Sequence, residues 1–333
     1  MILYIGNNIK SEKANVTTLQ LLASLLNKEN YEVVISSSQK NQILRMLAML
    51  YSVIKYRKKV SYILIDTYST KNFYYAIAVS QLARFYSLSY IPILHGGNLP
   101  YRLIHYPYLS KLVFDYAYIN VAPSNYLKNA FEKHGYNTIH IPNIIEIEKY
   151  AFKSRKIFKP KLLYVRSLSK IYNPCMAIKA LAELNIPEAK LCMVGPYNNE
   201  ELQECEELAK ELQVTNKVTF KGRLTKKAWH KLAEEYDIFI NTTTIDNTPI
   251  SVMEAMALGL PVISTNVGGI PFLIDDNETG VLVPSNNHVA MANAVKKIIG
   301  NTDVTKAICH NAYTKVAQYD WEIVKEQWKA ILK

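Results

Sequence analysis

The sequence predicts an α/β protein made of two doubly wound, Rossmann-like domains, and three observations support this prediction. The chain has 333 residues, about twice the length of an average domain. Short apolar runs rich in β-formers alternate with helix-length segments, which is typical of parallel sheets with crossover helices. A charged stretch without a clean period, residues 146–160, divides these runs into two sets. We therefore expect domains at 1–150 and 151–333, facing each other across a cleft.

Each expected strand is an apolar run flanked by polar or turn-forming residues. In the first domain, helical periodicity over Val16–Lys28 and Asn72–Tyr86 separates such runs. The first six expected strands are Ile2–Ile5, Tyr31–Ile35, Val60–Ile65, Tyr90–Leu94, Tyr116–Ala122 and Thr138–Pro142. The second six are Leu162–Val165, Lys190–Val194, Lys217–Phe220, Asp237–Asn241, Pro261–Ser264 and Val281–Pro284. Beyond Pro284 the pattern is helical, and Trp321 and Trp328 are spaced to pack one face of a terminal helix onto the body.

Composition excludes several classes of protein. With 49% hydrophobic and 20% charged residues, the chain is neither disordered nor fibrous. No apolar run reaches the roughly 18 residues of a membrane-spanning helix. No basic leader precedes the first strand, so we expect a cytoplasmic protein. The four cysteines show no ligand spacing and are expected to be reduced.

The formal net charge of +11 belongs entirely to the first half of the chain. Residues 1–157 hold 19 Lys and Arg against 8 Asp and Glu, whereas residues 158–333 hold 20 of each. An apolar helical pattern, Gln42–Lys59, ends in four cations, and a later aromatic segment contains Arg102, His105 and Lys111. This combination favours an acceptor-binding face at an anionic membrane surface. The alternative is a core helix whose cationic end is solvated and stabilised by the helix dipole.

The most informative stretch is Asn241–Pro271, which follows a predicted strand. Pro249 is expected at about the first turn of a helix, Ile250–Leu258, that ends at Gly259. The free amides of the first helical turn suit a phosphate or pyrophosphate, and Ser251 adds a hydroxyl donor beside Thr248 and Ile250. Glu254, one turn inside, suits a vicinal diol such as ribose, and Asp246 suits the hydroxyls of a second polyol. These groups together describe a sugar nucleotide site.

This stretch resembles the donor-binding signature of family 4 of the retaining glycosyltransferases (glycosyl transferases group 1), which have the two-domain GT-B fold. The match comprises Glu254-Ala255-Met256-Ala257, Gly259, Pro261-Val262 and Gly268-Gly269-Ile270-Pro271. Asp246 replaces the first of the family's two glutamates, and Phe272 stands where an acidic residue is frequent. Weaker matches are Val121-Ala122-Pro123-Ser124, Ile141-Pro142-Asn143 and Val218–Arg223, which includes Gly222 near the expected nucleotide base.

The resemblance implies roles for further residues. Arg166 and Lys170, or a neighbour of Lys170, would neutralise the departing nucleoside diphosphate, although this loop lacks the family's glycine. His95, directly after a predicted strand and before Gly96-Gly97, would be the catalytic histidine of the first domain. Gly6 and Asn7 resemble the family's glycine loop near the pyrophosphate. We assign Asp246 to the catalytic set together with His95, Arg166 and Lys170.

The resemblance implies a retaining, metal-independent enzyme that uses a nucleotide diphosphate sugar as co-substrate and no other cofactor. The expected acceptor is a lipid-linked or growing saccharide of surface polysaccharide biosynthesis, reached from the inner membrane face. A non-catalytic sugar-nucleotide-binding protein and a GT-B epimerase remain as alternatives, because binding residues alone fit all three. A dehydrogenase is not expected, because no G-x-G-x-x-G follows a strand. Nucleic acid is not expected as a partner, because it would not explain the motif in the neutral half.

Overall fold

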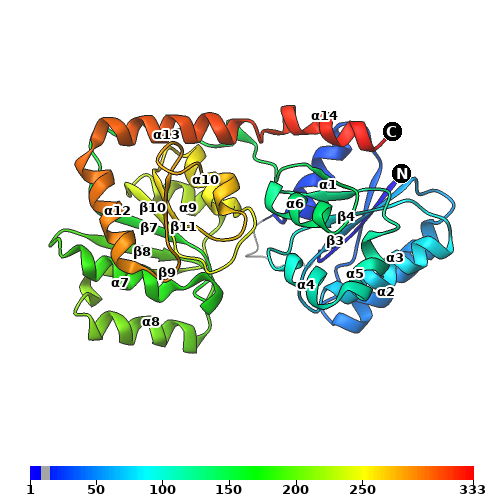
Figure 1. The fold of residues 1–333 in the computed structure, drawn as a ribbon, viewed down its shortest axis with the longest axis horizontal. Helices are drawn as coiled ribbons and strands as arrows, with labels where there is room; N and C mark the ends of the chain where they lie inside the picture. Colours follow the sequence, from blue (N-terminus) through cyan, green and yellow to red (C-terminus); the bar gives the residue numbers. More distant parts are fainter. Residues whose placement is uncertain (9–15) are drawn as a thin grey trace. The chain divides into compact units, whose positions relative to one another are not determined.

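The structure, a computed structural model, describes residues 1–8 and 16–333. It contains two compact units: unit 1 comprises 1–144 with 321–333, and unit 2 comprises 145–320 (Figure 1). Among the described residues, all twelve predicted strands are present, with bounds that differ by a few residues at most. The boundary after residue 144 lies a few residues before the expected one after residue 150. The last thirteen residues belong to unit 1, whereas the sequence analysis placed them in the second domain.

In the described part of unit 1, six parallel strands form one sheet in the order β2-β1-β3-β4-β5-β6. The strands are β1 (Ile2–Ile5), β2 (Val33–Ser36), β3 (Tyr62–Thr67), β4 (Tyr90–Leu94), β5 (Asn120–Ala122) and β6 (Thr138–His140). The helices are α1 (Thr18–Lys28), α2 (Gln42–Tyr56), α3 (Phe73–Phe85), α4 (Leu99–His105), α5 (Pro107–Phe114), α6 (Asn125–Lys133) and α14 (Trp321–Ile331). The strand order reverses between β1 and β3, which places the loops after these strands side by side.

Every residue of unit 2 is described, and its six parallel strands follow the order β12-β11-β10-β7-β8-β9. The strands are β7 (Lys161–Val165), β8 (Lys190–Val194), β9 (Val218–Gly222), β10 (Ile238–Asn241), β11 (Val262–Thr265) and β12 (Val281–Val283). The α-helices are α7 (Pro174–Leu184), α8 (Asn199–Glu211), α9 (Lys226–Ala233), α10 (Ile250–Ala257), α11 (Ile270–Leu273), α12 (His288–Gly300) and α13 (Thr302–Ala317). Short 3₁₀ helices are η1 (Ile147–Lys149), η2 (Lys170–Tyr172) and η3 (Thr215–Lys217). The reversal of order here lies between β7 and β10.

Helix α14 returns to unit 1 because its apolar face completes one side of that unit's core. Trp321 and Trp328 are 5% and 3% exposed and pack in one cluster with Tyr4 of β1 and Leu22 of α1. In Figure 1 the helix, in red, runs beside α1. The predicted packing of both tryptophans on one helix face is confirmed, while the unit that receives them depends on tertiary structure. No helix among the described residues is long and apolar enough to cross a membrane.

The tryptophans of α14 should stabilise unit 1 specifically. Trp328→Ala removes a large buried side chain and is expected to lower the free energy of unfolding by about 3–5 kcal/mol. Ile323→Ala, at an exposed position of the same helix (45%), should change it by about 0.5 kcal/mol or less. Hydrogen exchange of the β1 and α1 amides measures this effect within unit 1, and equal protection in the two variants would contradict the prediction.

Candidate functional site

The switch in strand order of the unit 2 sheet brings two predicted site residues together. Arg166 follows β7 and Asp246 lies in the loop after β10, and these two strands pair directly. Arg166 Nη2 and Asp246 Oδ2 form a hydrogen-bonded ion pair, with the side chains 21% and 15% exposed. Burial is the largest single effect and lowers the pKa of Arg166, but the charge and hydrogen bond of Asp246 together with Tyr172 and Tyr164 outweigh it and raise that pKa above its usual value. The guanidinium carbon also lies 4.8 Å from the ring centroid of Tyr172.

The loop that carries Asp246 is held by backbone contacts on both sides. The Thr242 hydroxyl lies 2.9 Å from the backbone oxygen of Tyr172, and the Thr244 N–H donates to that of Ile171. The Gly269 N–H donates to the backbone oxygen of Asp246 at 3.0 Å. A Cβ at Gly268 would clash with this same oxygen. The Gly268-Gly269 pair therefore permits the close approach that fixes the loop.

Gly195, after β8, likewise permits a close approach of the backbone, here that of Arg166. The sequence analysis did not identify Gly195. A Cβ there would clash with the backbone oxygen of Arg166. The Arg166 N–H in turn donates to the backbone oxygen of Val194 at 2.9 Å. A single glycine at the end of a strand was the only available signal, and it does not reveal which segment passes beside it.

The N-terminus of α10 has the features expected of an anion site. Pro249 is the N-cap residue, one position before the first turn where it was expected, and no side chain caps the helix. The Ser251 hydroxyl oxygen is buried and has no hydrogen-bond partner among the described residues. Thr248 and Ile250 are half-buried on either side of Pro249. Uncapped amides together with an unpaired buried hydroxyl suit a phosphate group.

Glu254 is buried, at 3% exposure, among groups that stabilise its charge. Tyr150 donates its hydroxyl to Oε1 at 3.0 Å, and Lys226 Nζ lies 2.6 Å from the same oxygen. His230 Nε2 lies 4.0 Å from Oε2. Burial raises the pKa of Glu254, but His230 and Lys226 together outweigh burial and hold that pKa below its usual value. The sequence analysis identified Glu254 but missed Tyr150, Lys226 and His230, which lie in separate segments.

Two other predicted residues of unit 2 lie at the carboxyl ends of strands. Gly222 ends β9 with φ +65°, and a Cβ there would lie 3.6 Å from the Tyr197 hydroxyl. Lys170, at the start of η2, is exposed, and its ammonium group has no hydrogen bond or ion pair with a described residue. Lys170 is therefore available to an anionic ligand, and its role stays a prediction.

In unit 1, His95 follows β4 and contacts a carboxylate that the sequence analysis did not identify. His95 Nε2 lies 2.9 Å from Oδ1 of Asp66, the buried penultimate residue of β3. The Tyr4 hydroxyl donates to the same oxygen at 2.9 Å. Tyr68 stacks on the imidazole with ring centroids 5.4 Å apart. A single acid at the end of an apolar strand was the signal that could have revealed Asp66.

Gly6 lies beside Asp66 for a packing reason. A Cβ at Gly6 would lie 2.6 Å from Asp66 Oδ2, and the Gly6 N–H already donates to the backbone oxygen of Ser36. Gly6 therefore has no free N–H to offer to a pyrophosphate. Asn7 follows it, and its side-chain oxygen Oδ1 is buried and without a partner among the described residues.

The three residues expected on the acceptor or membrane side differ in their exposure. Arg102 is half-buried: its Nη1 donates to the backbone oxygen of Ser69 at 3.3 Å, and its guanidinium carbon lies 4.0 Å from the ring centroid of Phe73. Arg102 thus packs against its own unit, and its place on the acceptor or membrane side stays a prediction. His105 and Lys111 are exposed. Within residues 1–8 and 16–333, no cluster of three or more His, Cys, Asp and Glu side chains could hold a metal ion.

The chain is similar to known proteins in sequence and in fold. A family model described as "Glycosyl transferases group 1" matches residues 146–315, just over half of the chain. A D-inositol 3-phosphate glycosyltransferase of Corynebacterium jeikeium is 26% identical over 178 residues, which are 51% of this chain and 42% of the relative. The match thus spans less than half of that relative's length.

Two solved structures show the same fold over nearly the whole chain. HepE of Anabaena, in complex with UDP and glucose, has a TM-score of 0.80 and 20% identity, covering 99% of this chain and 98% of the other. Sucrose-phosphate synthase of Thermosynechococcus elongatus has a TM-score of 0.82 and 16% identity, covering 99% and 97%. At these identities the likeness concerns the fold.

The contacts of Glu254 predict an effect of acid on unit 2. Because the pKa of Glu254 is lowered in the folded state, its stabilisation is present above the unfolded pKa of about 4.3 and is lost as pH falls through the folded value. Lys226→Met removes a cation, so the pKa of Glu254 should rise and this loss should begin at higher pH. Since the Lys226 side chain is 37% exposed, the stability change at neutral pH should be only about 1 kcal/mol.

Carboxyl ¹³C NMR titration of Glu254, with unfolding curves at several pH values, measures both effects. Lys227→Met, which alters the neighbouring lysine of α9, is the matched control. An unchanged Glu254 titration in Lys226→Met would contradict the prediction.

Proposed function

The chain belongs to the glycosyl transferases group 1 family, and we propose that it transfers a sugar from a nucleotide diphosphate sugar to an acceptor hydroxyl. The observation that carries this proposal is the convergence of complementary groups within unit 2. The uncapped start of α10 suits the diphosphate, Glu254 suits the ribose diol, and Asp246 suits the hydroxyls of the donor sugar.

Arg166 and Lys170 have the charge that such a reaction requires. When the bond between the anomeric carbon and the diphosphate oxygen breaks, the electron pair stays on that oxygen, and a nearby cation stabilises it. Arg166 is held in place by Asp246, and Lys170 is exposed. With these cations in the site we propose that transfer is metal-independent, and that it retains the anomeric configuration as in family 4.

We propose His95 of unit 1 as a further catalytic residue, with Asp66 as its positioning residue. The contact of 2.9 Å between His95 Nε2 and Asp66 Oδ1 fixes the ring orientation and selects which nitrogen carries the proton. Gly6 provides the space for Asp66 in this arrangement. The other ring nitrogen has no hydrogen-bond partner among the described residues, so a ring held in this way is suited to a single hydrogen-bonding task.

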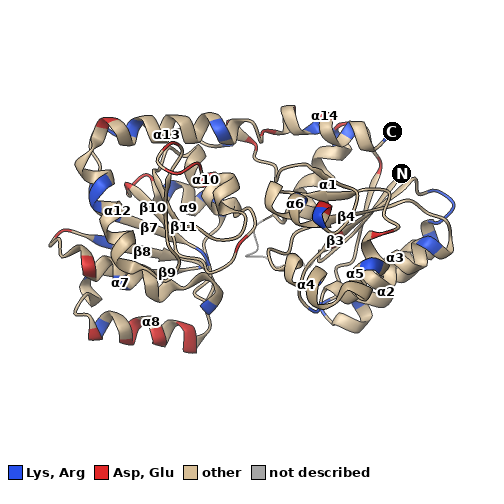
Figure 2. Cartoon of the chain, in the orientation of Figure 1, with Lys and Arg blue, Asp and Glu red and all other residues tan. Residues whose placement is uncertain are grey.

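The proposed acceptor is a saccharide or a lipid-linked saccharide in surface polysaccharide biosynthesis. We further propose that the protein acts at an anionic membrane surface. The distribution of charge supports this proposal. Unit 1 carries 18 Lys and Arg against 8 Asp and Glu, whereas unit 2 carries 21 against 20. In Figure 2 acidic residues gather on α8 of unit 2. The basic unit is thus the one suited to an anionic partner.

Nucleotide sugars should stabilise unit 2 through Arg166. In a thermal-shift screen over nucleotide diphosphate sugars, the correct donor at a hundred times its Kd should stabilise the protein by about 2.7 kcal/mol. Arg166→Ala should weaken donor binding by about tenfold or more, because a charge-assisted hydrogen bond to the diphosphate is lost. Lys296→Ala, at an exposed cation of α12, is the control. A full shift with Arg166→Ala would contradict the assignment of the diphosphate site.

His95 should affect turnover without affecting donor binding by unit 2. His95→Ala is expected to lower kcat by about 10²–10⁴-fold and to leave the donor-induced thermal shift unchanged. Asp66→Asn should give a smaller loss, together with an altered pH profile, because it acts through the imidazole.

NMR of the anomeric proton of the product tests retention. Donor binding without turnover in the presence of acceptors would instead favour a sugar-nucleotide-binding protein.

A further inference from the structure

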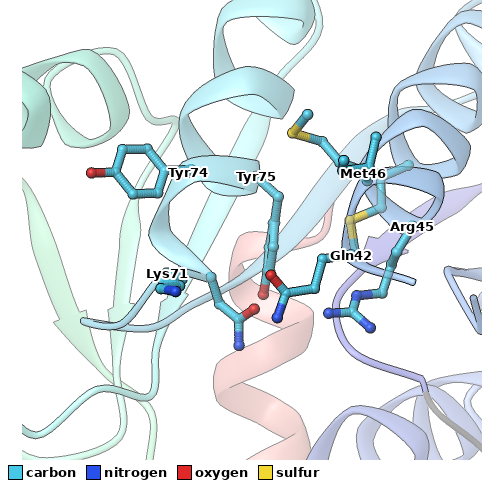
Figure 3. A pocket seen from close by; sticks show the side chains of 9 residues that line it. Gln42, Arg45, Met46, Lys71, Tyr74 and Tyr75 are labelled. Carbon is cyan, nitrogen blue, oxygen red and sulfur yellow. The ribbon is translucent and has the colours of Figure 1, made fainter. Parts of the chain in front are cut away.

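A cavity of about 310 Å³ lies between α2 and α3 in unit 1 (Figure 3). Its apolar wall includes Met46 and Met49 of α2 and the ring of Tyr74 on α3. Among the described residues that line it, Arg45 and Lys71 are cations and none is acidic. Its volume lies at the lower end of the range for small-ligand sites. The cavity therefore suits a ligand with an anionic group and an apolar part.

Arg45 is a preorganised cation in this cavity. It is only 6% exposed, and its Nη1 donates to the backbone oxygens of Gln39 at 3.0 Å and Lys40 at 3.3 Å. The rest of its guanidinium has no hydrogen-bond partner among the described residues. In Figure 3 the polar ends of Arg45 and Gln42 lie on the same side of the pocket. A guanidinium anchored at one nitrogen and free at the others suits the oxygens of a phosphate.

The cavity continues into an exposed apolar face of α2, which we call the α2 stripe. The stripe consists of Ile43, Leu44, Leu47, Tyr51 and Ile54, which are 39–67% exposed. Their spacing places them on one side of the helix, and Ile43 also lines the cavity. The opposite side of α2 buries Arg45, Met49 and Val53. The helix therefore has a core face and a second, uncovered apolar face, which a core helix does not need.

Cations at the C-terminal end of α2 indicate the partner of this stripe. Just beyond α2 the chain carries Arg57, Lys58 and Lys59, following Lys55 in the last turn. Apolar side chains bordered by cations are typical of helices that lie in the interface of an anionic bilayer. An apolar protein partner would not require the two cations inside the cavity.

We propose that the cavity and the α2 stripe form a docking surface for an anionic phospholipid in a membrane. The lipid phosphate binds Arg45 and Lys71, and the acyl region lies along the stripe. This inference rests on the proposed function, in which the protein acts at an anionic membrane surface. Within unit 1, the cavity-lining Tyr75 donates its hydroxyl to the backbone oxygen of Asp66 at 2.5 Å, and Asp66 contacts His95. Hydrogen bonds through Tyr75 and Asp66 thus connect the cavity wall to the candidate catalytic histidine.

Flotation of the full chain with vesicles tests this surface. At physiological salt the protein should bind mixed phosphatidylcholine–phosphatidylglycerol vesicles and not pure phosphatidylcholine vesicles. Lys71→Glu should weaken binding by about 20-fold. The substitution removes a positive charge and adds a negative one, and each of these two changes near the surface contributes about fivefold. Leu47→Glu should weaken it by about tenfold or more, because it places a carboxylate in the stripe.

Matched controls change the same kinds of residue elsewhere in unit 1. Ile323→Glu alters an exposed aliphatic residue of α14, and Lys28→Glu alters an exposed lysine at the end of α1. Each should change vesicle binding by about twofold at most, because charges beyond about one Debye length are screened. Losses with the controls that equal those with Leu47→Glu and Lys71→Glu would overturn the proposal, as would equal binding to neutral vesicles.

Two further measurements separate the alternatives. Inorganic phosphate at constant ionic strength should compete for Arg45 and Lys71 and weaken vesicle binding, whereas phosphate binding by a protein that does not bind anionic vesicles would assign the cavity to free phosphate and overturn the lipid proposal. The donor-induced thermal shift of Leu47→Glu should equal that of the unsubstituted chain. A normal donor shift without vesicle binding overturns this inference and the proposed membrane surface but leaves the proposed sugar transfer intact, whereas vesicle binding without any donor shift contradicts the proposed transfer.

Discussion

The ion pair between Arg166 and Asp246 is the contact on which the candidate donor site depends. It joins the loops after two adjacent strands at the point where the order of the unit 2 sheet reverses. Removing either partner would leave the other charge partly buried and unpaired, which lowers stability. The surrounding backbone is shaped to permit the pair, since Gly195 makes room for the Arg166 carbonyl and Gly268 makes room for the Asp246 carbonyl. The glycines and the ion pair therefore work as one unit.

The fold was predictable because its signals are local, whereas much of the site was not. Each parallel strand is a short apolar run, so the alternation of runs and helices reveals both sheets, and a motif places Glu254 on a helix. The partners of Glu254 come from the segment before β7 and from α9, and no spacing rule connects these segments. Asp66 was missed for the same reason, because its contact with His95 crosses between strands. The return of α14 to unit 1 depends on which core its tryptophans fit.

The positive charge of the protein belongs to one compact unit rather than simply to the first half of the sequence. Unit 1 is strongly basic with α14 included, and unit 2 is nearly neutral. A nearly neutral unit binds an anion through a few placed groups, such as the start of α10 and Arg166, rather than through a general field. A basic unit with an exposed apolar stripe acts over an extended surface instead. The two kinds of electrostatics suit a small anionic donor and a broad anionic partner, respectively.

The environment of Glu254 shows how a buried carboxylate stays ready for a neutral ligand. A bare carboxylate at 3% exposure would take up a proton, and a protonated acid accepts hydrogen bonds poorly. His230 and Lys226 prevent this by holding the pKa of Glu254 below its usual value, and the Lys226 side chain, which lies 2.6 Å from Oε1, is 37% exposed. When the hydroxyls of a diol approach, they can replace Lys226 as hydrogen-bond donors to Glu254, because the exposed ammonium group can bind water instead. The free-energy cost of this replacement is lower than that of desolvating a free carboxylate. The lysine thus keeps Glu254 ionised in the empty site without closing the site to the ligand.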